Sequence, residues 1–110
     1  MERLFSYGTL QMREVQLANF GRELTGQPDS LVGYRMEDVQ LTDETVIRLS
    51  GKSIHKIVTG SENHLDEVEG VVFEITSEEL AAADDYECEE YRRVPTILKS
   101  GLQAWVYVTA

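Results

Sequence analysis

Short runs of strand-forming residues, separated by turn residues, recur along most of this chain and constrain its fold more than any other feature. The regular alternation of strand and helix that builds a parallel sheet is missing. Closely spaced short strands favour an antiparallel sheet that curls on itself or closes into a small barrel. The predicted strands are residues 4–7, 31–41, 45–49, 53–59, 68–75, 94–98 and 102–108.

Two segments of the chain are predicted to be helical. Residues 11–24 suit a helix or a helical excursion, whereas residues 26–30, which contain Gly26 and Pro28, are predicted to form a loop. A second helix is predicted to begin after Thr76, because Glu79 follows three residues later and the pair forms a capping box.

The second predicted helix places a carboxylate on its inward face. Leu80, Ala83 and Glu87 are spaced i, i+3 and i+7, so they share one face if the helix extends that far. Tyr86 and Tyr91 flank Glu87 in the sequence. Burial against aromatic side chains raises the pKa of a carboxyl group, which suits a general acid/base that works near neutral pH.

The other unusual segment is Tyr7-Gly8-Thr9-Leu10, where the first predicted strand runs into a turn. Such a turn exposes backbone N–H groups, and Gly8 has no Cβ to obstruct the approach of a ligand. Main-chain donors of this kind hold a carboxylate or a polarised carbonyl. The alternatives stay open at this point: the segment is an ordinary turn, and the acidic run 84–90 is a solvated helix end.

Length and charge set limits on the class of protein. The chain has 110 residues, the common size of a single domain, and we expect residues 1–110 to form one domain. Its formal net charge of −10 argues against nucleic acid and anionic membrane surfaces as partners. No apolar run approaches the roughly 18 residues of a membrane span, and the start of the chain lacks the pattern of a secretory signal.

The cysteine and histidine residues point away from disulfide and metal chemistry. The single cysteine, Cys88, excludes an internal disulfide and fits a reducing compartment, so we expect a soluble cytoplasmic protein. His55 and His64 have no partner at the spacing of a zinc site, and no metal is expected. Acidic neighbours are expected to raise the pKa of the Cys88 thiol and make it a poor nucleophile.

Two hydroxyl residues and two aromatic residues receive weaker interpretations. Ser6 and Thr9 would act as nucleophiles only with a base nearby, which the sequence does not show. Trp105 and Tyr107 alternate as strand residues do and are interpreted as core and face residues.

Both unusual segments resemble motifs of one family, in the same order and at similar spacing. Residues 5–10 look like the Tyr-Gly-Ser/Thr-Leu loop of the gamma-glutamylcyclotransferase-like (AIG2-like) proteins. Residues 84–94 resemble that family's Asp-x-Tyr/Phe-Glu…Tyr-x-Arg signature, and residues 31–35, 68–75 and 104–108 are similar to its strands. The chain departs from the family in having Cys88 where a glycine often follows the glutamate, which affects the predicted shape of the pocket.

The resemblance implies an α+β fold, a small, mostly antiparallel β-barrel with flanking helices and a pocket at one mouth. It also implies a reaction in which the α-amine of a γ-glutamyl compound attacks its own γ-carbonyl and releases 5-oxoproline and an amine. No cofactor is needed. Glu87 would be the acid/base, and Tyr91 and Arg93 would support the pocket. The residues that would receive the γ-glutamyl group are Tyr7, Gly8, Thr9 and Leu10.

Three functions are therefore compatible with the sequence. The first is a cyclotransferase acting on a γ-glutamyl amine, amino acid or peptide. The second is a non-catalytic module of the same fold that binds a small metabolite, and the third is an acidic interaction domain with a filled pocket. The walls that would select the leaving amine are expected within residues 40–66.

Overall fold

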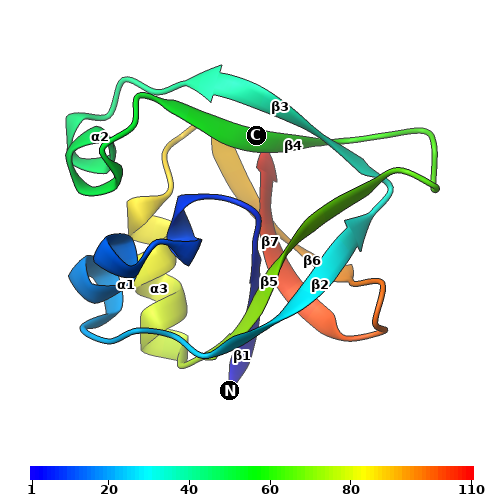
Figure 1. The fold of residues 1–110 in the computed structure, drawn as a ribbon, viewed down its shortest axis with the longest axis horizontal. Helices are drawn as coiled ribbons and strands as arrows, with labels where there is room; N and C mark the ends of the chain where they lie inside the picture. The colour runs from blue at the N-terminus through cyan, green and yellow to red at the C-terminus, as the bar shows by residue number, and fades with distance from the viewer.

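Five strands form the main sheet of the computed structural model, which describes residues 1–110 (Figure 1). In spatial order they are β2 (Gly26–Val32), β5 (Glu67–Ile75), β1 (Glu2–Ser6), β7 (Gln103–Thr109) and β6 (Tyr91–Ile97). Neighbouring strands are antiparallel except β1 and β7, which run parallel and pair at Leu4 and Trp105. The central strand of the sheet is therefore β1, the first in the chain.

A separate two-stranded ribbon crosses the top of the view in Figure 1. Its strands, β3 (Tyr34–Gln40) and β4 (Ile54–Gly60), pair with each other in antiparallel register. Side chains of β6 and β7 form hydrogen bonds to the backbone of β4. The Tyr91 hydroxyl donates to the Lys56 carbonyl at 2.8 Å, and the Thr109 hydroxyl donates to the Val58 carbonyl at 2.9 Å. The ribbon is thus joined to the main sheet through side chains.

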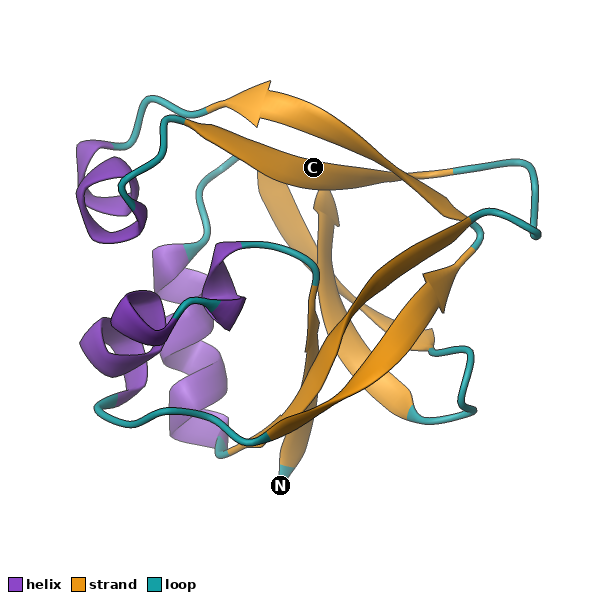
Figure 2. Cartoon of the chain, viewed as in Figure 1, coloured by secondary structure: helices purple, strands orange, loops and turns teal.

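The predicted fold class is confirmed at the coarse level. The chain is α+β, its strands are mostly antiparallel, and helices flank the sheet on one side (Figure 2). The predicted closure into a barrel is not found, because the strands form two sheets that share no backbone ladder.

Three α-helices gather on the same side of the molecule (Figure 2): α1 (Arg13–Phe20), α2 (Glu44–Ser50) and α3 (Ser77–Tyr86). The predicted capping box begins α3: the Thr76 hydroxyl accepts from the Glu79 amide at 3.0 Å, and the Glu79 carboxylate accepts from the Thr76 amide at 2.9 Å. The helix predicted over residues 11–24 is shorter, since α1 ends at Gly21 in the left-handed conformation, with φ 68°.

Two predicted elements have the wrong type, and the single strand predicted over residues 31–41 is divided at Gly33, φ 81°, between β2 and β3. Residues 45–49 form helix α2, because the Asp43 carboxylate accepts from the amides of Thr45 and Val46 and caps a helix that their β-branched side chains alone would not favour. Residues 26–30 belong to strand β2, because Pro28 is tolerated on the edge of a sheet.

The central strand β1 is buried on both faces. Successive side chains of a strand point to opposite faces, and the fully buried Leu4 and Phe5 accordingly belong to two different core clusters. The Leu4 cluster lies against the helices and includes residues of α1, α2 and α3. The position of the loop after β1 is therefore fixed by packing on both sides of the sheet.

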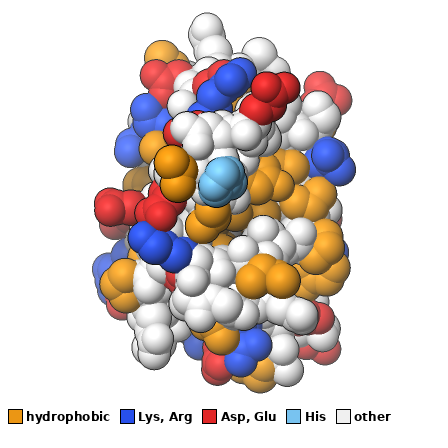
Figure 3. All heavy atoms as spheres, turned by 90° about the vertical axis from the view of Figure 1, so that its right-hand side faces the viewer, with side chains coloured by type: hydrophobic (Ala, Val, Ile, Leu, Met, Phe, Trp, Pro, Cys, Tyr) orange, Lys and Arg blue, Asp and Glu red, His pale blue; other side chains and the backbone are white.

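The end of the molecule opposite the helices carries many apolar side chains at its surface (Figure 3). The core cluster that contains Phe5 is only partly shielded from solvent. Tyr34, Val94 and Leu102 pack against this cluster and are themselves only partly buried. Exposed Leu65 and Ile97 add to the apolar surface of the molecule. No helix of the chain is both long enough and apolar enough to cross a membrane.

Gly70 on β5 allows a close approach to β1. A Cβ at Gly70 would clash with the carbonyl oxygen of Ser6 and lie 2.6 Å from Cζ of Phe5. We expect Gly70→Ala to lower the free energy of unfolding by about 1–3 kcal/mol, the usual cost of overpacking, as measured by urea denaturation. Gly60→Ala is the matched control, because a Cβ there would meet nothing within 4 Å. Equal stability of the two variants would contradict the packing argument.

Candidate functional site

The loop after β1 lies against the C-terminal half of β7. The Tyr7 hydroxyl donates to the Tyr107 carbonyl at 2.6 Å, and the Gly8 amide donates to Oγ of Ser6 at 3.3 Å. A short 3₁₀ helix, Thr9–Gln11, follows. Its first turn leaves amides without an intrahelical acceptor, as every helix start does.

Gly8 faces open space at this loop. A Cβ at this position would meet no heavy atom within 4 Å, and the backbone, at φ −132°, is not in the left-handed region. Glycine is therefore not required here by backbone conformation. Its effect is to leave room in front of the loop.

The carboxylate of Glu87 approaches the loop from the end of α3. The helix ends at Tyr86, and the Glu87 amide still donates to the Ala83 carbonyl at 3.0 Å. Glu87 itself has extended backbone angles, φ −70° and ψ 137°. Its inward position therefore comes from the residue that follows the helix and not from the continued helical phase that the sequence spacing assumed.

Loop and carboxylate line one small cavity. Its volume of about 20 Å³ gives room for about one water molecule. Every predicted site residue except Arg93 lies on its wall. The lining residues are Phe5, Ser6, Tyr7, Gly8, Thr9, Leu10, His55, Lys56, Glu87, Tyr91 and Tyr107.

Burial dominates the chemistry of Glu87. The residue is half-buried, but protein atoms surround its carboxyl group closely. This burial, with a smaller contribution from the nearby Asp84 charge, raises the pKa of Glu87 to about 8. No hydrogen bond from the chain offsets this effect. Glu87 is thus poised to exchange a proton close to neutral pH.

Four tyrosines lie near enough to Glu87 to feel its charge, and the hydroxyl of each is hydrogen-bonded to another group of the chain. Burial, together with the negative charge of Glu87, raises the pKa of Tyr7, Tyr91 and Tyr107. Burial also raises the pKa of Tyr86 to about 12, and its hydroxyl lies 2.7 Å from Oγ1 of Thr9. All four phenols therefore remain protonated at neutral pH and serve as hydrogen-bond partners.

Arg93 lies behind the cavity wall and not on it. Its guanidinium forms a two-pronged ion pair with Asp84, at 2.8 and 3.0 Å, and stacks over Trp105 at 4.3 Å from the ring centroid. The same Asp84 carboxylate accepts from the Tyr107 hydroxyl at 2.7 Å. Asp84 thus joins the last turn of α3 to β6 and β7, three residues before Glu87.

Leu10 contributes to the site in a different way from its neighbours. Its side chain is buried in the helix-side core, and its carbonyl accepts from the Gln16 side-chain amide at 2.9 Å. Leu10 therefore anchors the loop, so that any contact with a ligand falls to its backbone amide.

No site role is predicted from the sequence for His55, Lys56 or Tyr107. Nε2 of His55 lies 3.0 Å from both the Lys52 carbonyl and Oγ of Ser50, and burial lowers the pKa of the imidazole. Because a carbonyl only accepts, Nε2 carries the ring proton in this geometry. Nothing near His55 in the sequence indicates its position, whereas the alternation along β7 does place Tyr107 facing inward.

No hydrogen bond joins a nucleophile candidate to a base. Oγ of Ser6 accepts from the Gly8 amide, and the Thr9 hydroxyl pairs with Tyr86. Cys88 is a free, half-buried thiol whose pKa is raised to about 11, first by burial and then by neighbouring acids. The predicted direction of the Cys88 shift is confirmed, and no activated nucleophile lines the cavity.

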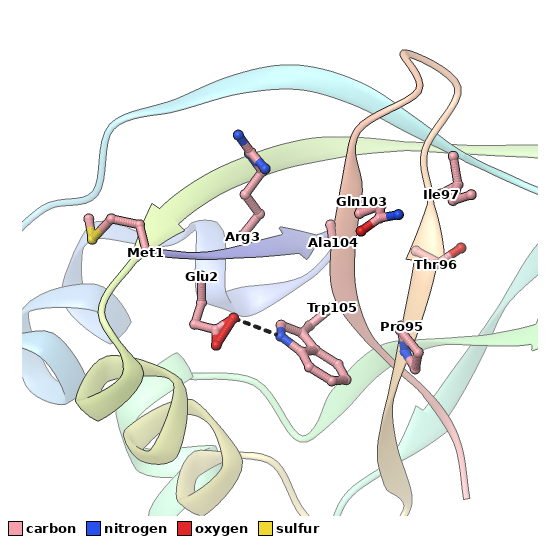
Figure 4. Close-up of a pocket in the computed structure, with 9 residues that line it drawn as sticks. All are labelled: Met1, Glu2, Arg3, Pro95, Thr96, Ile97, Gln103, Ala104 and Trp105. Atoms are coloured by element: carbon pink, nitrogen blue, oxygen red, sulfur yellow. Dashed lines mark hydrogen bonds between the residues drawn. The ribbon is translucent and has the colours of Figure 1, made fainter.

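A larger cavity lies at the other end of β1 (Figure 4). It measures about 500 Å³ and lies among the first residues of β1, the end of β6 and the start of β7. Two of its lining residues are hydrogen-bonded to each other: Nε1 of Trp105 donates to the Glu2 carboxylate at 3.1 Å. The larger cavity contains none of the predicted site residues, so the smaller cavity is the better candidate.

The chain was also compared with known protein families. The sequence pattern of the family described as "Gamma-glutamyl cyclotransferase, AIG2-like" matches residues 4–110. The chain belongs to the AIG2-like gamma-glutamyl cyclotransferase family. No curated protein is significantly similar to this AIG2-like chain in sequence.

Solved structures share the fold of this AIG2-like chain. A protein named gamma-glutamyl cyclotransferase superposes with a TM-score of 0.72 at 16% identity, over 99% of this chain and 66% of that one. Arabidopsis thaliana At5g39720.1 gives 0.71 at 23% identity, over 98% and 68% of the two chains. PH0828 from Pyrococcus horikoshii gives 0.64 at 18% identity, over 99% and 78%. At these identities the likeness is one of fold, and the chain spans only part of each neighbour.

The raised pKa of Glu87 predicts a pH-dependent stability difference. Between the ordinary carboxyl pKa of about 4.5 and the folded value of about 8, the folded state binds more protons than the unfolded state. The wild type therefore loses stability as pH rises through this range. We expect Glu87→Gln, which carries no charge, to raise Tm relative to wild type more at pH 9 than at pH 5.

Thermal unfolding at both pH values measures this difference. Glu89→Gln, at an exposed position two residues later, removes the same charge and is the control. If both variants showed the same pH dependence, the burial of Glu87 would not be the cause.

Proposed function

We propose that the protein is a cyclotransferase that acts on a γ-glutamyl amine, amino acid or peptide and releases 5-oxoproline. The observation that carries this proposal is the cavity in which Glu87, with a pKa raised to about 8, faces the loop of Tyr7, Gly8 and Thr9. Family membership supports the reaction class. We propose a single domain over residues 1–110, and the reaction that we write needs no cofactor.

Proton transfer is the first task of the proposed site. The α-amine of a glutamyl group has a pKa of about 8 and attacks only when it is neutral. Glu87 has a similar proton affinity in the empty site, so transfer of a proton from the ammonium group to its carboxylate needs little free energy. The cavity thus matches the base to the group that it deprotonates.

The proposed reaction forms one bond and breaks one bond. The α-nitrogen attacks the γ-carbonyl carbon, and the bond from that carbon to the leaving nitrogen breaks. Two protons lost from the α-ammonium group pass by way of Glu87 to the leaving nitrogen, which departs as an ammonium ion. The ring that forms is 5-oxoproline, and no water enters the products.

The loop after β1 is proposed to hold the glutamyl group. Free amides in the first turn of the 3₁₀ helix suit the α-carboxylate, since such donors bind anions. Fixing this carboxylate restricts the flexible glutamyl chain to a conformation that closes a ring. Tyr7 and Tyr91 add neutral hydroxyl groups beside Glu87.

A glutamyl group is larger than the space of about 20 Å³ in this cavity. A second hollow of about 200 Å³ adjoins it and shares five of its lining residues. We propose that binding widens the rim between the two, where the ribbon is tied by the hydrogen bond from Tyr91 to Lys56.

The decisive variant is Glu87→Gln, which keeps the size of the side chain and removes its proton exchange. We expect release of 5-oxoproline from a panel of γ-glutamyl amines, amino acids and peptides, and a loss of kcat/KM of about 10²–10⁴-fold in the variant. The wild-type rate should rise with pH toward an apparent pKa near 8. Product is measured by mass spectrometry, with Glu89→Gln as the control. Full activity of Glu87→Gln would contradict the assigned role.

A substitution at Gly8 tests the role of the loop in substrate binding without a large effect on stability. A Cβ at Gly8 would stand in open space, so Gly8→Ala should leave Tm nearly unchanged. The same methyl group would occupy space in front of the loop, and we expect KM to rise severalfold with a smaller change in kcat. Gly60→Ala, also in open space but away from the cavity, should change neither constant. An unaltered KM in Gly8→Ala would place the substrate elsewhere.

One alternative is a non-catalytic module of the same fold that binds a carboxylate-bearing metabolite. This alternative predicts that a γ-glutamyl compound raises Tm without any product being formed. It also predicts that the rise survives Glu87→Gln.

A further inference from the structure

The hollow of about 200 Å³ beside the candidate site has a distinct composition. It shares Tyr7, Gly8, Thr9, His55 and Lys56 with the inner cavity. Its remaining walls come from Met12 on one side and from Lys52 and Ile54 on the other. The hollow is free volume next to the loop, so it offers room for a group attached to the γ-carbonyl of a substrate held there.

The charged side chains of this hollow are positive, whereas the chain as a whole is negatively charged. The protein carries a formal net charge of −10, with 20 acidic side chains. No acidic side chain lines the hollow, although two lysines do. The Lys56 ammonium is paired with Asp38 across the ribbon, whereas Lys52 forms no ion pair in the chain. Lys52 is therefore the unneutralised charge at this site.

The backbone of Lys52 is held in place by buried polar groups. Its amide donates to Oγ of Ser50 at 3.2 Å, and its carbonyl accepts from Nε2 of His55 at 3.0 Å. Ser50 and His55 are both buried. Lys52 and His55 both line the hollow, and the positive charge of Lys52 adds to burial in lowering the pKa of the His55 imidazole.

The remaining walls are apolar. Ile54 is 56% exposed, and Met12 lies opposite it on the loop before α1. A cation beside an aliphatic wall complements an amino acid that has a free carboxylate and an aliphatic side chain. It complements a cationic or purely alkyl amine less well.

We propose that this hollow receives the departing half of the substrate and that Lys52 selects a leaving amine that carries a carboxylate. The substrate class is then a γ-glutamyl amino acid or peptide and not a simple γ-glutamyl amine. This inference rests on the proposed function, and its test separates the two.

The test compares γ-glutamyl-leucine with γ-glutamyl-leucinamide, which differ by one carboxylate. Their leaving amines differ in basicity, so the quantity of interest is the change in the ratio of their kcat/KM values between wild type and variant. We expect Lys52→Met to lower the preference for the leucine compound by about two- to fivefold, the size of an exposed ion pair. Lys52→Glu should lower it further, and high salt should reduce the effect.

Lys99→Met is the matched control, because it removes the same charge at an exposed lysine that pairs with Glu67, away from the hollow. Its ratio should equal that of wild type. Equal ratios in Lys52→Met and wild type, with turnover present, would overturn the selection by Lys52 and leave the proposed function standing.

A binding measurement tests the role of Lys52 if the protein forms no product. Calorimetry of both compounds with Glu87→Gln, alone and combined with Lys52→Met, gives the same ratio from Kd values. A Lys52-dependent Kd ratio without any product would overturn the proposed reaction and support the selection. Absence of both binding and product would overturn both.

Discussion

The attachment of Asp84 to the sheet is the interaction on which the site depends. Asp84 lies in the last turn of α3 and binds Arg93 of β6 and the Tyr107 hydroxyl of β7. Three residues later the chain reaches Glu87, whose backbone leaves the helix. The ion pair thereby fixes where the carboxylate stands relative to the strands. The guanidinium also stacks over Trp105, 4.3 Å from the ring centroid.

Burial then gives this carboxylate its chemistry. Apolar packing on both faces of β1 fixes the loop that begins at Tyr7, and the loop closes over Glu87. A carboxyl group without hydrogen-bond donors in such a place holds its proton to a higher pH than usual. The same Asp84 that positions Glu87 also raises its pKa through its charge. Position and proton affinity therefore have one structural origin.

Local signals decide what was predictable from the sequence. The capping box of Thr76 and Glu79 is complete within four residues, so the start of α3 was predicted correctly. In α2 the β-branched residues 45–47 outweighed the single cap at Asp43, and a helix was predicted as a strand. The two motifs placed most of the candidate site, since each is contiguous in the sequence. His55 reaches the cavity through a turn and a sheet register, neither of which the sequence displays.

The central claim is that Glu87 enables the substrate's own α-amine to attack its γ-carbonyl. Reaction of a γ-glutamyl amino acid in water enriched in ¹⁸O tests this most directly, with products read by mass spectrometry. The account predicts 5-oxoproline without ¹⁸O, formed by wild type and not by Glu87→Gln. Glutamate carrying ¹⁸O in its γ-carboxylate would show that water is the nucleophile and would contradict the account.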